Sequence, residues 1–337
     1  MQYQYLTQVY GKSLVQWAKS RPELIVFSGD LTGSTEISDF KNNYPDRFFN
    51  LGMAEQNMMS FAGGMAREGY TPFVHTFAVF MYRRALDQIE MSIAYPNLKV
   101  RMMGFLPGIL TPGGVSHQAI NDIGVLRSLP NLTLIEAADA TDLETMFPVL
   151  DQIDGPVYVR VHRKEVPRLF PAAQPFQLNR VRVLSEGSDL TLVTSGICTE
   201  EALRVTALLK KQGVNIEHLH VSTHKPFSDP QVARSCAKSP HVITMENHSI
   251  YNGLASEVAE AMALNGVGAT LHRIGLQDTY AYGATERHLM RVFGLDGMAL
   301  AAKIEDALGA KFGLQAEQLS NVRLSTAGIA AEQLEAL

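Results

Sequence analysis

The chain has 337 residues, of which 46% are hydrophobic and 19% are charged, so it can build the cores of about two globular domains. Its formal net charge of −5 argues against bulk binding of nucleic acid, which requires clustered positive charge. No apolar run reaches the roughly 18 residues of a membrane span, and the N-terminus lacks the layout of a signal peptide, so a cytoplasmic protein without membrane contact is expected.

In the first half of the chain, apolar β-rich runs alternate with helical patterns. The runs lack strict alternation, which is typical of strands buried on both faces of a parallel sheet, and they cover 24–30, 71–77, 132–139 and 157–161. Helical patterns cover 8–20, 54–68, 78–95, 118–128 and 141–151, and the last opens with a capping-box spacing, Thr141-Asp-Leu-Glu144. The pair Gly63-Gly64 costs roughly 1 kcal/mol per residue relative to alanine. Such a cost is tolerated where another backbone must come close.

Residues 166–187 interrupt this alternation, because three prolines between positions 167 and 177 favour an extended linker. Beyond the linker, strands are expected at 190–196, 215–222, 241–247 and 269–275, and helices at 199–212, 250–264 and 297–308. The predicted fold class is α/β, with two doubly wound domains. The predicted boundaries are 1–165 for the first domain, 166–187 for the linker, 188–325 for the second domain and 326–337 for a tail.

Ligands of open parallel sheets bind beyond the carboxyl ends of the strands. In the first domain, this rule selects the loops 30–34, 52–55, 75–77 and 104–117. Glu55 lies in this set, in the first turn of an apolar helix within FNLGMAEQNMMSFAGGMA. It is either an acid favoured by the helix dipole, at about 0.3–1 kcal/mol, or a functional carboxylate whose proton affinity is raised by an apolar pocket. Spacing alone leaves both interpretations open.

Three further groups near these loops also have two interpretations each. Phe77 and Phe80 are either core residues or an aromatic platform for a flat heterocycle. His117 ends the glycine-rich loop PGILTPGGVSHQ and is either a solvated or structural histidine or a general acid–base group close to a ligand. The basic run Arg160–Lys164 is either a solvated strand edge or an anion-binding corner, for which arginine is suited by its bidentate fork.

Several signatures of other chemistries are absent from the sequence. There is no GxxxxGK[ST], HExxH or GxSxG motif and no clear GxGxxG after a strand. No GDG followed by a metal-binding asparagine is found, so the sequence contains no recognisable cradle for a diphosphate and magnesium. The two cysteines, Cys198 and Cys236, have neither the number nor the spacing of a disulfide framework or metal site, and buried free thiols are expected.

The motifs GMAEQN, TFxxF and GGVSHQ occur in this order and are followed by IGVLRSLPNLTLIEAADATDLE, ITMENHSIYNGLASEVAEAMA and FGLDGMALAAKIEDAL. Together they resemble the C-terminal half of the transketolase family, over about residues 5–315. The resemblance implies a pyrimidine-binding domain of the thiamine-diphosphate type, followed by a transketolase C-terminal domain. It also implies the transfer of a two-carbon ketol unit from a sugar or sugar-phosphate donor to an aldose acceptor.

Because the diphosphate-binding domain is missing, the chain is similar to the small subunit of a split, two-subunit transketolase. The resemblance then implies a partner chain, the N-terminal diphosphate-binding subunit, that holds Mg²⁺ and the diphosphate of thiamine diphosphate. A heterotetramer of two large and two small subunits is expected, with catalysis only in the presence of the partner.

The resemblance also implies roles for individual residues toward the cofactor. Glu55 matches the glutamate that hydrogen-bonds the pyrimidine ring nitrogen and favours the tautomer that removes the thiazolium proton. Phe77 and Phe80 match the aromatic positions that flank the pyrimidine. Asp30 matches an aspartate that lines the cofactor site.

Toward the substrate, three residues match family positions. His117 matches the histidine that contacts ketose oxygens near the reacting carbon. Ser34 and Arg163 match groups that bind the sugar phosphate at the mouth of the channel.

Three other substrate positions depart from the family pattern. An aspartate that contacts a sugar hydroxyl is replaced at about Gly113, a histidine at the start of the same loop is replaced by Phe105, and an arginine before the first helix is replaced by Thr7. The resemblance therefore implies the same cofactor chemistry on an altered donor or acceptor, such as a branched or sulfonated sugar. Xylulose 5-phosphate remains allowed.

Three alternative functions share this fold. The first is the beta subunit of a 2-oxoacid dehydrogenase, against which the TFxxF spacing and the RSLPN segment argue. A relative of 1-deoxyxylulose-phosphate synthase is disfavoured because those enzymes are single long chains. The third alternative is a non-catalytic subunit, against which the retention of Glu55, Phe77, Phe80 and His117 argues.

Overall fold

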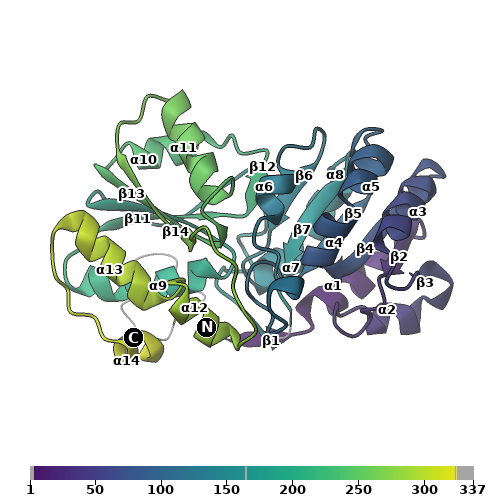
Figure 1. Cartoon of the computed structure of the whole chain (residues 1–337), viewed down its shortest axis with the longest axis horizontal. Coiled ribbons are helices and arrows are strands. Elements are labelled where there is room, and N and C mark those ends of the chain that lie inside the picture. Colours follow the sequence, from purple (N-terminus) through teal and green to yellow (C-terminus); the bar gives the residue numbers. More distant parts are fainter. Residues whose placement is uncertain (1–3, 164, 323, 325–337) are drawn as a thin grey trace.

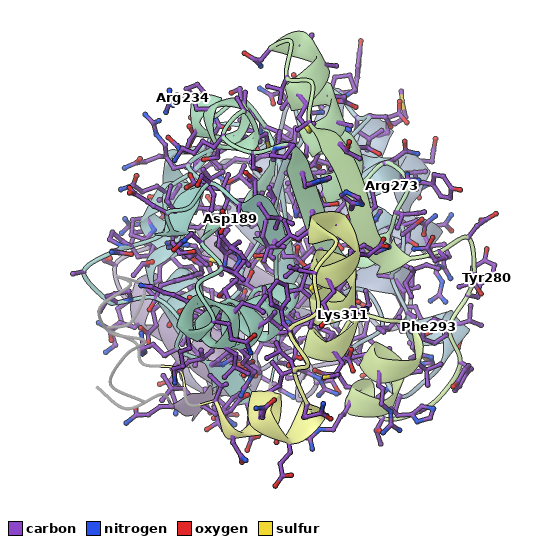
Figure 2. The ribbon with its side chains drawn as sticks, turned by 90° about the vertical axis from the view of Figure 1, so that its left-hand side faces the viewer. Asp189, Arg234, Arg273, Tyr280, Phe293 and Lys311 are labelled. Atoms are coloured by element: carbon purple, nitrogen blue, oxygen red, sulfur yellow. The ribbon has the colours of Figure 1, made fainter. Side chains whose placement is uncertain are left out.

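The computed structural model describes residues 4–163, 165–322 and 324, and the predicted tail at 326–337 lies outside them. The described chain forms two α/β units whose sheets stand side by side, the first on the right and the second on the left in Figure 1. Figure 2 views the second unit end-on and shows Arg234 and Arg273 at its surface. Within the described residues, no helix is long and apolar enough to cross a membrane. The predicted α/β class with two doubly wound domains is confirmed.

The first sheet has the strand order β12-β6-β7-β5-β4-β2-β3. Its six first-domain strands are parallel, and they are β2 (Leu24–Ser28), β3 (Phe48–Asn50), β4 (Thr71–Phe77), β5 (Arg101–Phe105), β6 (Thr133–Glu136) and β7 (Val157–Val161). The four predicted strands are present. β5 was not predicted, because its sequence RMMGF contains no β-branched residue. All residues of β2, β4, β5, β6 and β7 are buried, as expected for a sheet covered on both faces.

The helices of the first domain include several that are shorter than the sequence pattern predicted. The predicted helix 78–95 is divided into α4 (Ala78–Arg84), α5 (Leu86–Gln88) and the π-helix η2 (Ile89–Ala94). The predicted helix 141–151 is divided into α7 (Ala140–Thr145) and α8 (Phe147–Gln152), because Pro148 cannot donate a helical backbone hydrogen bond. The remaining helical segments are α1 (Val9–Ala18), α2 (Ser38–Asn43), η1 (Pro45–Arg47), α3 (Glu55–Arg67), η3 (Val115–His117) and α6 (Asp122–Leu126), the last of which replaces the predicted helix 118–128.

The start of α7 corrects a second prediction. The predicted capping box at Thr141–Glu144 is wrong. The N-cap of α7 is instead Asp139, whose Oδ1 accepts the N–H of Asp142 at 2.8 Å. Thr141 instead donates its hydroxyl to the carbonyl of Phe170 at 2.6 Å. The cap therefore begins two residues earlier than predicted and is tied to the segment that follows the first domain.

The second sheet has the strand order β14-β13-β10-β11-β9. β10 (Leu190–Ser195), β11 (Ile216–Val221), β13 (His241–Ser249) and β14 (Thr270–Leu276) are parallel, as predicted, and β9 (Arg182–Ser185) joins antiparallel to β11. β9 falls inside the predicted linker, and β8 (Glu165–Pro167), at its start, pairs with β1 (Tyr5–Thr7). The helices of this half are α9 (Cys198–Lys211), α10 (Pro230–Cys236), α11 (Leu254–Leu264), α12 (Glu286–Val292), α13 (Gly297–Leu308) and α14 (Ala316–Asn321).

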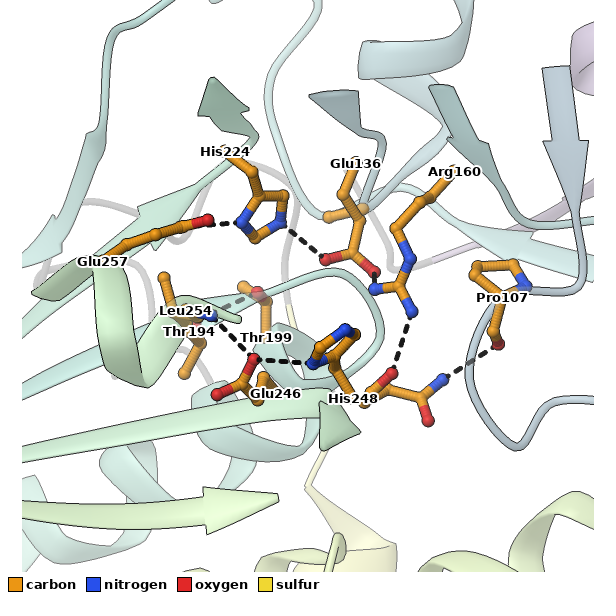
Figure 3. A network of polar contacts seen from close by, with 12 residues as sticks. Pro107, Glu136, Arg160, Thr194, Thr199, His224, Glu246, His248, Leu254 and Glu257 are labelled. Carbon is orange, nitrogen blue, oxygen red and sulfur yellow. Dashed lines mark hydrogen bonds and ion pairs between the residues drawn. The ribbon is translucent and has the colours of Figure 1, made fainter. Parts of the chain in front are cut away.

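One strand of the second half belongs to the first sheet. β12 (Thr223–Lys225) pairs antiparallel with β6 and brings His224 into a buried polar network between the domains (Figure 3). The Nδ1 of His224 lies 2.9 Å from Glu257 Oε2, and its Nε2 lies 3.2 Å from Glu136 Oε2. Arg160 donates to the other oxygen of Glu136 at 2.5 Å.

The charges in this network compensate one another. Burial alone would lower the pKa of His224, but Glu257 and Glu136 outweigh it and raise the pKa to about 10. Burial alone would raise the pKa of Glu136, but Arg160 and His224 hold it below its usual range. A charged His224 between two carboxylates therefore connects the two domains at the edge of the first sheet that β12 forms.

Candidate functional site

The parallel strands of the first sheet all end at the same edge, as the sequence predicted. Phe77, the last residue of β4, lies at this edge, and the segments after β2, β3, β5 and β7 bring Asp30, Glu55, His117 and Arg163 to it. His75, within one of the selected loops, is an exception. It lies fully buried inside β4, where its Nε2 is 2.6 Å from the hydroxyl of Tyr10 and burial lowers its pKa to about 3.

Glu55 is the first residue of α3, and its side chain is only 1% exposed. Met58, Met59 and Ala62 are buried behind it in the same helix. The surroundings are nevertheless not purely apolar, because Arg84 Nη1 lies 3.0 Å from Oε1 and 2.9 Å from Oε2 of Glu55. The expectation of an apolar pocket is corrected in this respect: the buried carboxylate has a cationic partner from the end of α4.

Phe77, Phe80 and His117 form one aromatic group at the edge of the sheet. The rings of Phe77 and Phe80 are stacked with centroids 5.8 Å apart. The ring of His117 meets both edge-on, at 6.3 Å from Phe77 and 5.2 Å from Phe80. The guanidinium of Arg84 lies 4.9 Å from the centroid of Phe80, so this group is continuous with Glu55. We call Glu55, Phe77, Phe80, Arg84 and His117 the strand-end cluster.

Gly113 determines where the ring of His117 can lie. A Cβ atom at Gly113 would stand 2.8 Å from Cγ of His117, closer than side chains approach one another. Ser116 contributes a second contact, with its Oγ 2.9 Å from Nδ1 of His117. The position at which the sequence lacks an expected acidic side chain is therefore filled by the histidine itself.

The loop that carries His117 is held by the second domain. Asn247 of β13 is fully buried, and its Oδ1 accepts the N–H of Ile109 at 3.0 Å while its Nδ2 donates to the carbonyl of Pro107 at 3.2 Å. Gly108 lies between these two residues with φ of 63°, and a Cβ there would overlap Asn247 at 2.2 Å. Gln118 adds a hydrogen bond to the carbonyl of Tyr282 at 3.2 Å.

Arg160 and Arg163 of the basic run have different environments. Arg160 is only 1% exposed and contacts Asp122 at 3.0 Å, Glu136 and the carbonyl of Asn247, so it is a buried structural residue and not part of a solvated edge or an anion site. Arg163 is partly buried, with its guanidinium 5.8 Å from the centroid of Phe77. Burial lowers the pKa of Arg163, and the charge of Glu36 opposes this. Of the two, only Arg163 is partly exposed.

A cavity of about 1080 Å³ opens beside Arg163 between the two domains. Leu106 and Leu110 line it from the first domain, and Arg204 and Arg291 line it from the second. No member of the strand-end cluster lines the cavity, and Arg163, which does line it, lies beside Phe77 of the cluster. Ser34 lies in the turn between β2 and α2, two residues before Glu36, and no contact joins it to the cluster within the described residues.

Asp30 follows β2 in a left-handed conformation, with φ of 62°. Its Oδ1 accepts a hydrogen bond from Asn50 Nδ2 at 3.0 Å, and its backbone N–H donates to Asn50 Oδ1 at 3.1 Å. The same Asn50 oxygen accepts the N–H of Gly52 at 3.2 Å. Asp30 therefore organises the turn that leads to Glu55.

The three departures from the family pattern have different surroundings. Phe105 ends β5 opposite Phe77 of β4, but its side chain is fully buried and meets the ring of Tyr10 edge-on at 5.2 Å, so it is a core residue. Thr7 is exposed in β1. Gly113 lies directly against the ring of His117 in the strand-end cluster.

Sequence reasoning missed two residues of the site. Arg84 could have been found, because it follows Phe80 by four positions and so shares its helix face. Asn247 could not, because its partners in the chain lie 138 and 140 residues away.

Each half of the chain matches a known protein family. The family described as "Transketolase, pyrimidine binding domain" matches residues 3–168, and the family described as "Transketolase, C-terminal domain" matches residues 179–300. A solved structure described as "Split gene transketolase, inactive beta4 tetramer" is 36% identical with a TM-score of 0.81, and the match covers 90% of this chain and 98% of that one.

Three relatives are also similar over most of this chain. A "putative transketolase C-terminal section" from Methanocaldococcus jannaschii is 34% identical over 91% of this chain and 97% of its own length. The "6-deoxy-6-sulfo-D-fructose transketolase subunit SqwH" from Clostridium sp. is 35% identical over 86% of this chain and 90% of its own length. A 1-deoxy-D-xylulose-5-phosphate synthase from Chlorobium phaeovibrioides is 31% identical over 88% of this chain but only 47% of its own length.

Proposed function

Because the chain belongs to the transketolase family, we propose that it is the small subunit of a split, thiamine-diphosphate-dependent transketolase that moves a two-carbon ketol unit between sugars. The observation that carries this proposal is the meeting of Glu55, the stacked pair Phe77/Phe80 and His117 beyond the carboxyl ends of β3, β4 and β5. No one of these groups alone would distinguish a cofactor site from a packed core.

The residues present fit the pyrimidine half of such a site. Glu55 supplies a buried carboxylate beside the aromatic pair, and Phe77 and Phe80 supply apolar ring faces for a flat heterocycle. When bound, thiamine diphosphate supplies the carbon nucleophile that the side chains of a protein lack. Glu55 would hold the pyrimidine ring nitrogen by a hydrogen bond, in a site from which the apolar wall of α3 excludes water.

Substrate groups are assigned to the side of the cluster that faces His117 and Arg163. His117 would contact oxygens of the ketose near the reacting carbon, and Arg163, with Ser34 beyond it, would bind an anionic end of the sugar. Because His117 packs against Gly113, a sugar hydroxyl that would meet an acid there in other family members has no such partner here. An altered donor or acceptor is therefore proposed, and the similar subunit named for 6-deoxy-6-sulfo-D-fructose gives one chemical example.

The rest of the cofactor is assigned to a partner chain. Within the described residues, no group of three or more His, Cys, Asp or Glu side chains could hold a metal ion, and the sequence has no GDG motif. We therefore assign the diphosphate and Mg²⁺ to an N-terminal, diphosphate-binding subunit, and we expect a heterotetramer. The similar split-gene structure is described as an inactive tetramer of beta chains, which supports the need for a second kind of subunit.

The experiment that tests the proposal is an assay of this chain reconstituted with a diphosphate-binding partner. Ketol transfer to an aldehyde is expected. Glu55→Ala should lower kcat by roughly 100-fold or more, because the carboxylate that would hydrogen-bond the pyrimidine ring nitrogen is lost. Glu68→Ala is the matched control, since Glu68 is exposed just beyond the other end of α3.

The same assay separates the alternative functions. Decarboxylation of a 2-oxoacid without ketol transfer would assign the chain to the dehydrogenase beta subunits. Condensation of pyruvate with glyceraldehyde 3-phosphate would assign it to the synthase type. Ketol transfer at an unchanged rate in Glu55→Ala would show that Glu55 is not catalytic.

A further inference from the structure

Within the described residues, Arg84 is the cationic side chain that contacts the carboxylate of Glu55. A single guanidinium nitrogen, Nη1, contacts both carboxylate oxygens, at 2.9 and 3.0 Å. The two partners are unequal, because the side chain of Glu55 is 1% exposed and that of Arg84 is 50% exposed. The acid is therefore fixed in the protein, whereas the base approaches it from the solvent side.

The need for this contact follows from the burial of Glu55. A carboxylate removed from water is costly unless a charge or several hydrogen bonds compensate it. Glu55 lies at the start of α3 and Arg84 is the last residue of α4, so each helix dipole also favours its charge. In the absence of a ligand, Arg84 thus supplies the positive charge that compensates the buried carboxyl group of Glu55.

The position of Arg84 conflicts with a ring bound to Glu55. Its guanidinium touches both oxygens that would accept a hydrogen bond from a ring nitrogen, and it also lies over Phe80. The neighbouring Arg83 does neither, since its guanidinium contacts the hydroxyl of Tyr82 at 3.1 Å and the carbonyl of Gln118 at 3.4 Å. The occupation of the site is therefore specific to Arg84.

We propose that Arg84 is a positioning residue that holds the Glu55 carboxylate in the cofactor-free subunit and leaves it when the aminopyrimidine ring binds. The inference rests on the proposed function, since it requires that Glu55 receives the ring. The exposed side chain of Arg84 can turn into solvent, so the ring can replace Arg84 at Glu55 without movement of α3 or α4. Arg84 stabilises only the free state, and it therefore lowers the apparent affinity for the cofactor.

This assignment predicts opposite effects of one substitution on two measurements. Arg84→Met should lower the dissociation constant for thiamine diphosphate, measured with Mg²⁺ on the complex with the partner, by roughly tenfold because the competing contact is removed. It should also lower the melting temperature of the cofactor-free subunit, because Glu55 loses its counter-charge. A residue with only a structural role would lower stability and weaken binding together.

Three further variants make the test specific. Arg84→Lys keeps the charge and should lie between the wild type and Arg84→Met in both measurements. Arg234→Met, which removes an exposed arginine of α10 (Figure 2), should change neither. In a Glu55→Gln background, Arg84→Met should no longer tighten binding, because the two residues act through one contact.

The outcomes separate this inference from the proposed function. If the wild-type complex binds thiamine diphosphate and Arg84→Met binds it equally or more weakly, the positioning role is wrong and the function stands. If the wild-type complex does not bind thiamine diphosphate, both are wrong. Persistence of the tighter binding in the Glu55→Gln background would show that Arg84 acts on another group and would also overturn the inference.

Discussion

His224 lies where three elements from distant parts of the chain meet. It belongs to β12, and its two ring nitrogens face Glu136 of β6 and Glu257 of α11. Its burial makes the charged form costly, but two carboxylates within hydrogen-bond distance outweigh that cost and raise its pKa to about 10. A group of this kind links the stability of the whole protein to pH.

The direction of this linkage can be worked out. The folded pKa of His224 lies above its unfolded value of about 6.5, so its stabilisation is fully present below about pH 6.5 and is lost as the pH rises toward about 10. Between pH 7 and pH 9, the loss of this stabilisation should lower the free energy of unfolding by up to about 1.4 kcal/mol for each unit by which the pH rises. Chemical denaturation at pH 7, 8 and 9 would measure this slope, and His224→Gln should show a shallower one. Equal slopes in both proteins would contradict the charged assignment.

At the scale of single residues, the sequence identified what local spacing can indicate. Glu55, Phe77 and Phe80 were selected because they follow strand ends and start helices, and His117 because it closes a glycine-rich loop. Arg160 was misread as surface or anion-binding, because its partners Asp122 and Glu136 lie 38 and 24 residues away. The roles of all these residues toward a cofactor or substrate stay predictions.

At the scale of secondary structure, the two adjacent glycines of α3 differ in their surroundings. A Cβ on Gly63 would stand 2.3 Å from the carbonyl oxygen of Ser92 in η2, whereas a Cβ on Gly64 would meet nothing within 4 Å. The expectation that another backbone comes close is thus confirmed for Gly63 and wrong for Gly64. The two helices pack closely at one residue of the pair.

This difference predicts opposite results for two matched substitutions. Gly63→Ala should lower the free energy of unfolding by about 1–3 kcal/mol, because the backbones of α3 and η2 must separate. Gly64→Ala should raise it by up to about 1 kcal/mol, because it restricts the unfolded chain and improves helix propensity without a clash. Urea denaturation of both variants would measure the effect, and similar values for the two would contradict the packing described here.

The loop 107–118 is an element whose position depends on the second domain. Removing the amide of Asn247 in Asn247→Ala leaves the N–H of Ile109 and the carbonyl of Pro107 buried without their partner. Stability should fall by about 1–3 kcal/mol, and ketol transfer should decrease further because His117 loses its support. Asn265→Ala, at an exposed helix end, is the control. Wild-type activity in Asn247→Ala would show that the second domain does not position this loop.

Element boundaries were predicted less well than element types, for physical reasons. Hydrophobic periodicity continues through Ala85 and Met146, so it cannot reveal that the predicted helices divide there. β5 was not predicted because methionine and glycine have little preference for strands. β12 was hidden because a three-residue strand has no periodicity, and its pairing with β6 depends on the arrangement of both domains.

At the scale of the whole molecule, the two α/β units act on one site from different directions. The first sheet delivers Glu55, Phe77 and Phe80 at its strand ends, and the second domain fixes the loop of His117 through Asn247. The chain has an acid, an aromatic wall and a histidine at this edge, but within the described residues no metal-binding cluster. This composition fits our proposal that the chain contributes the pyrimidine half of a cofactor site.

The measurement that tests this account most directly is a calorimetric titration of thiamine diphosphate, in the presence of Mg²⁺, into this subunit alone and into its complex with the diphosphate-binding partner. We predict weak or undetectable binding to the subunit alone and tight, magnesium-dependent binding to the complex. Tight, magnesium-dependent binding to the isolated subunit, or no binding to the complex, would contradict the assignment of half a site to this chain.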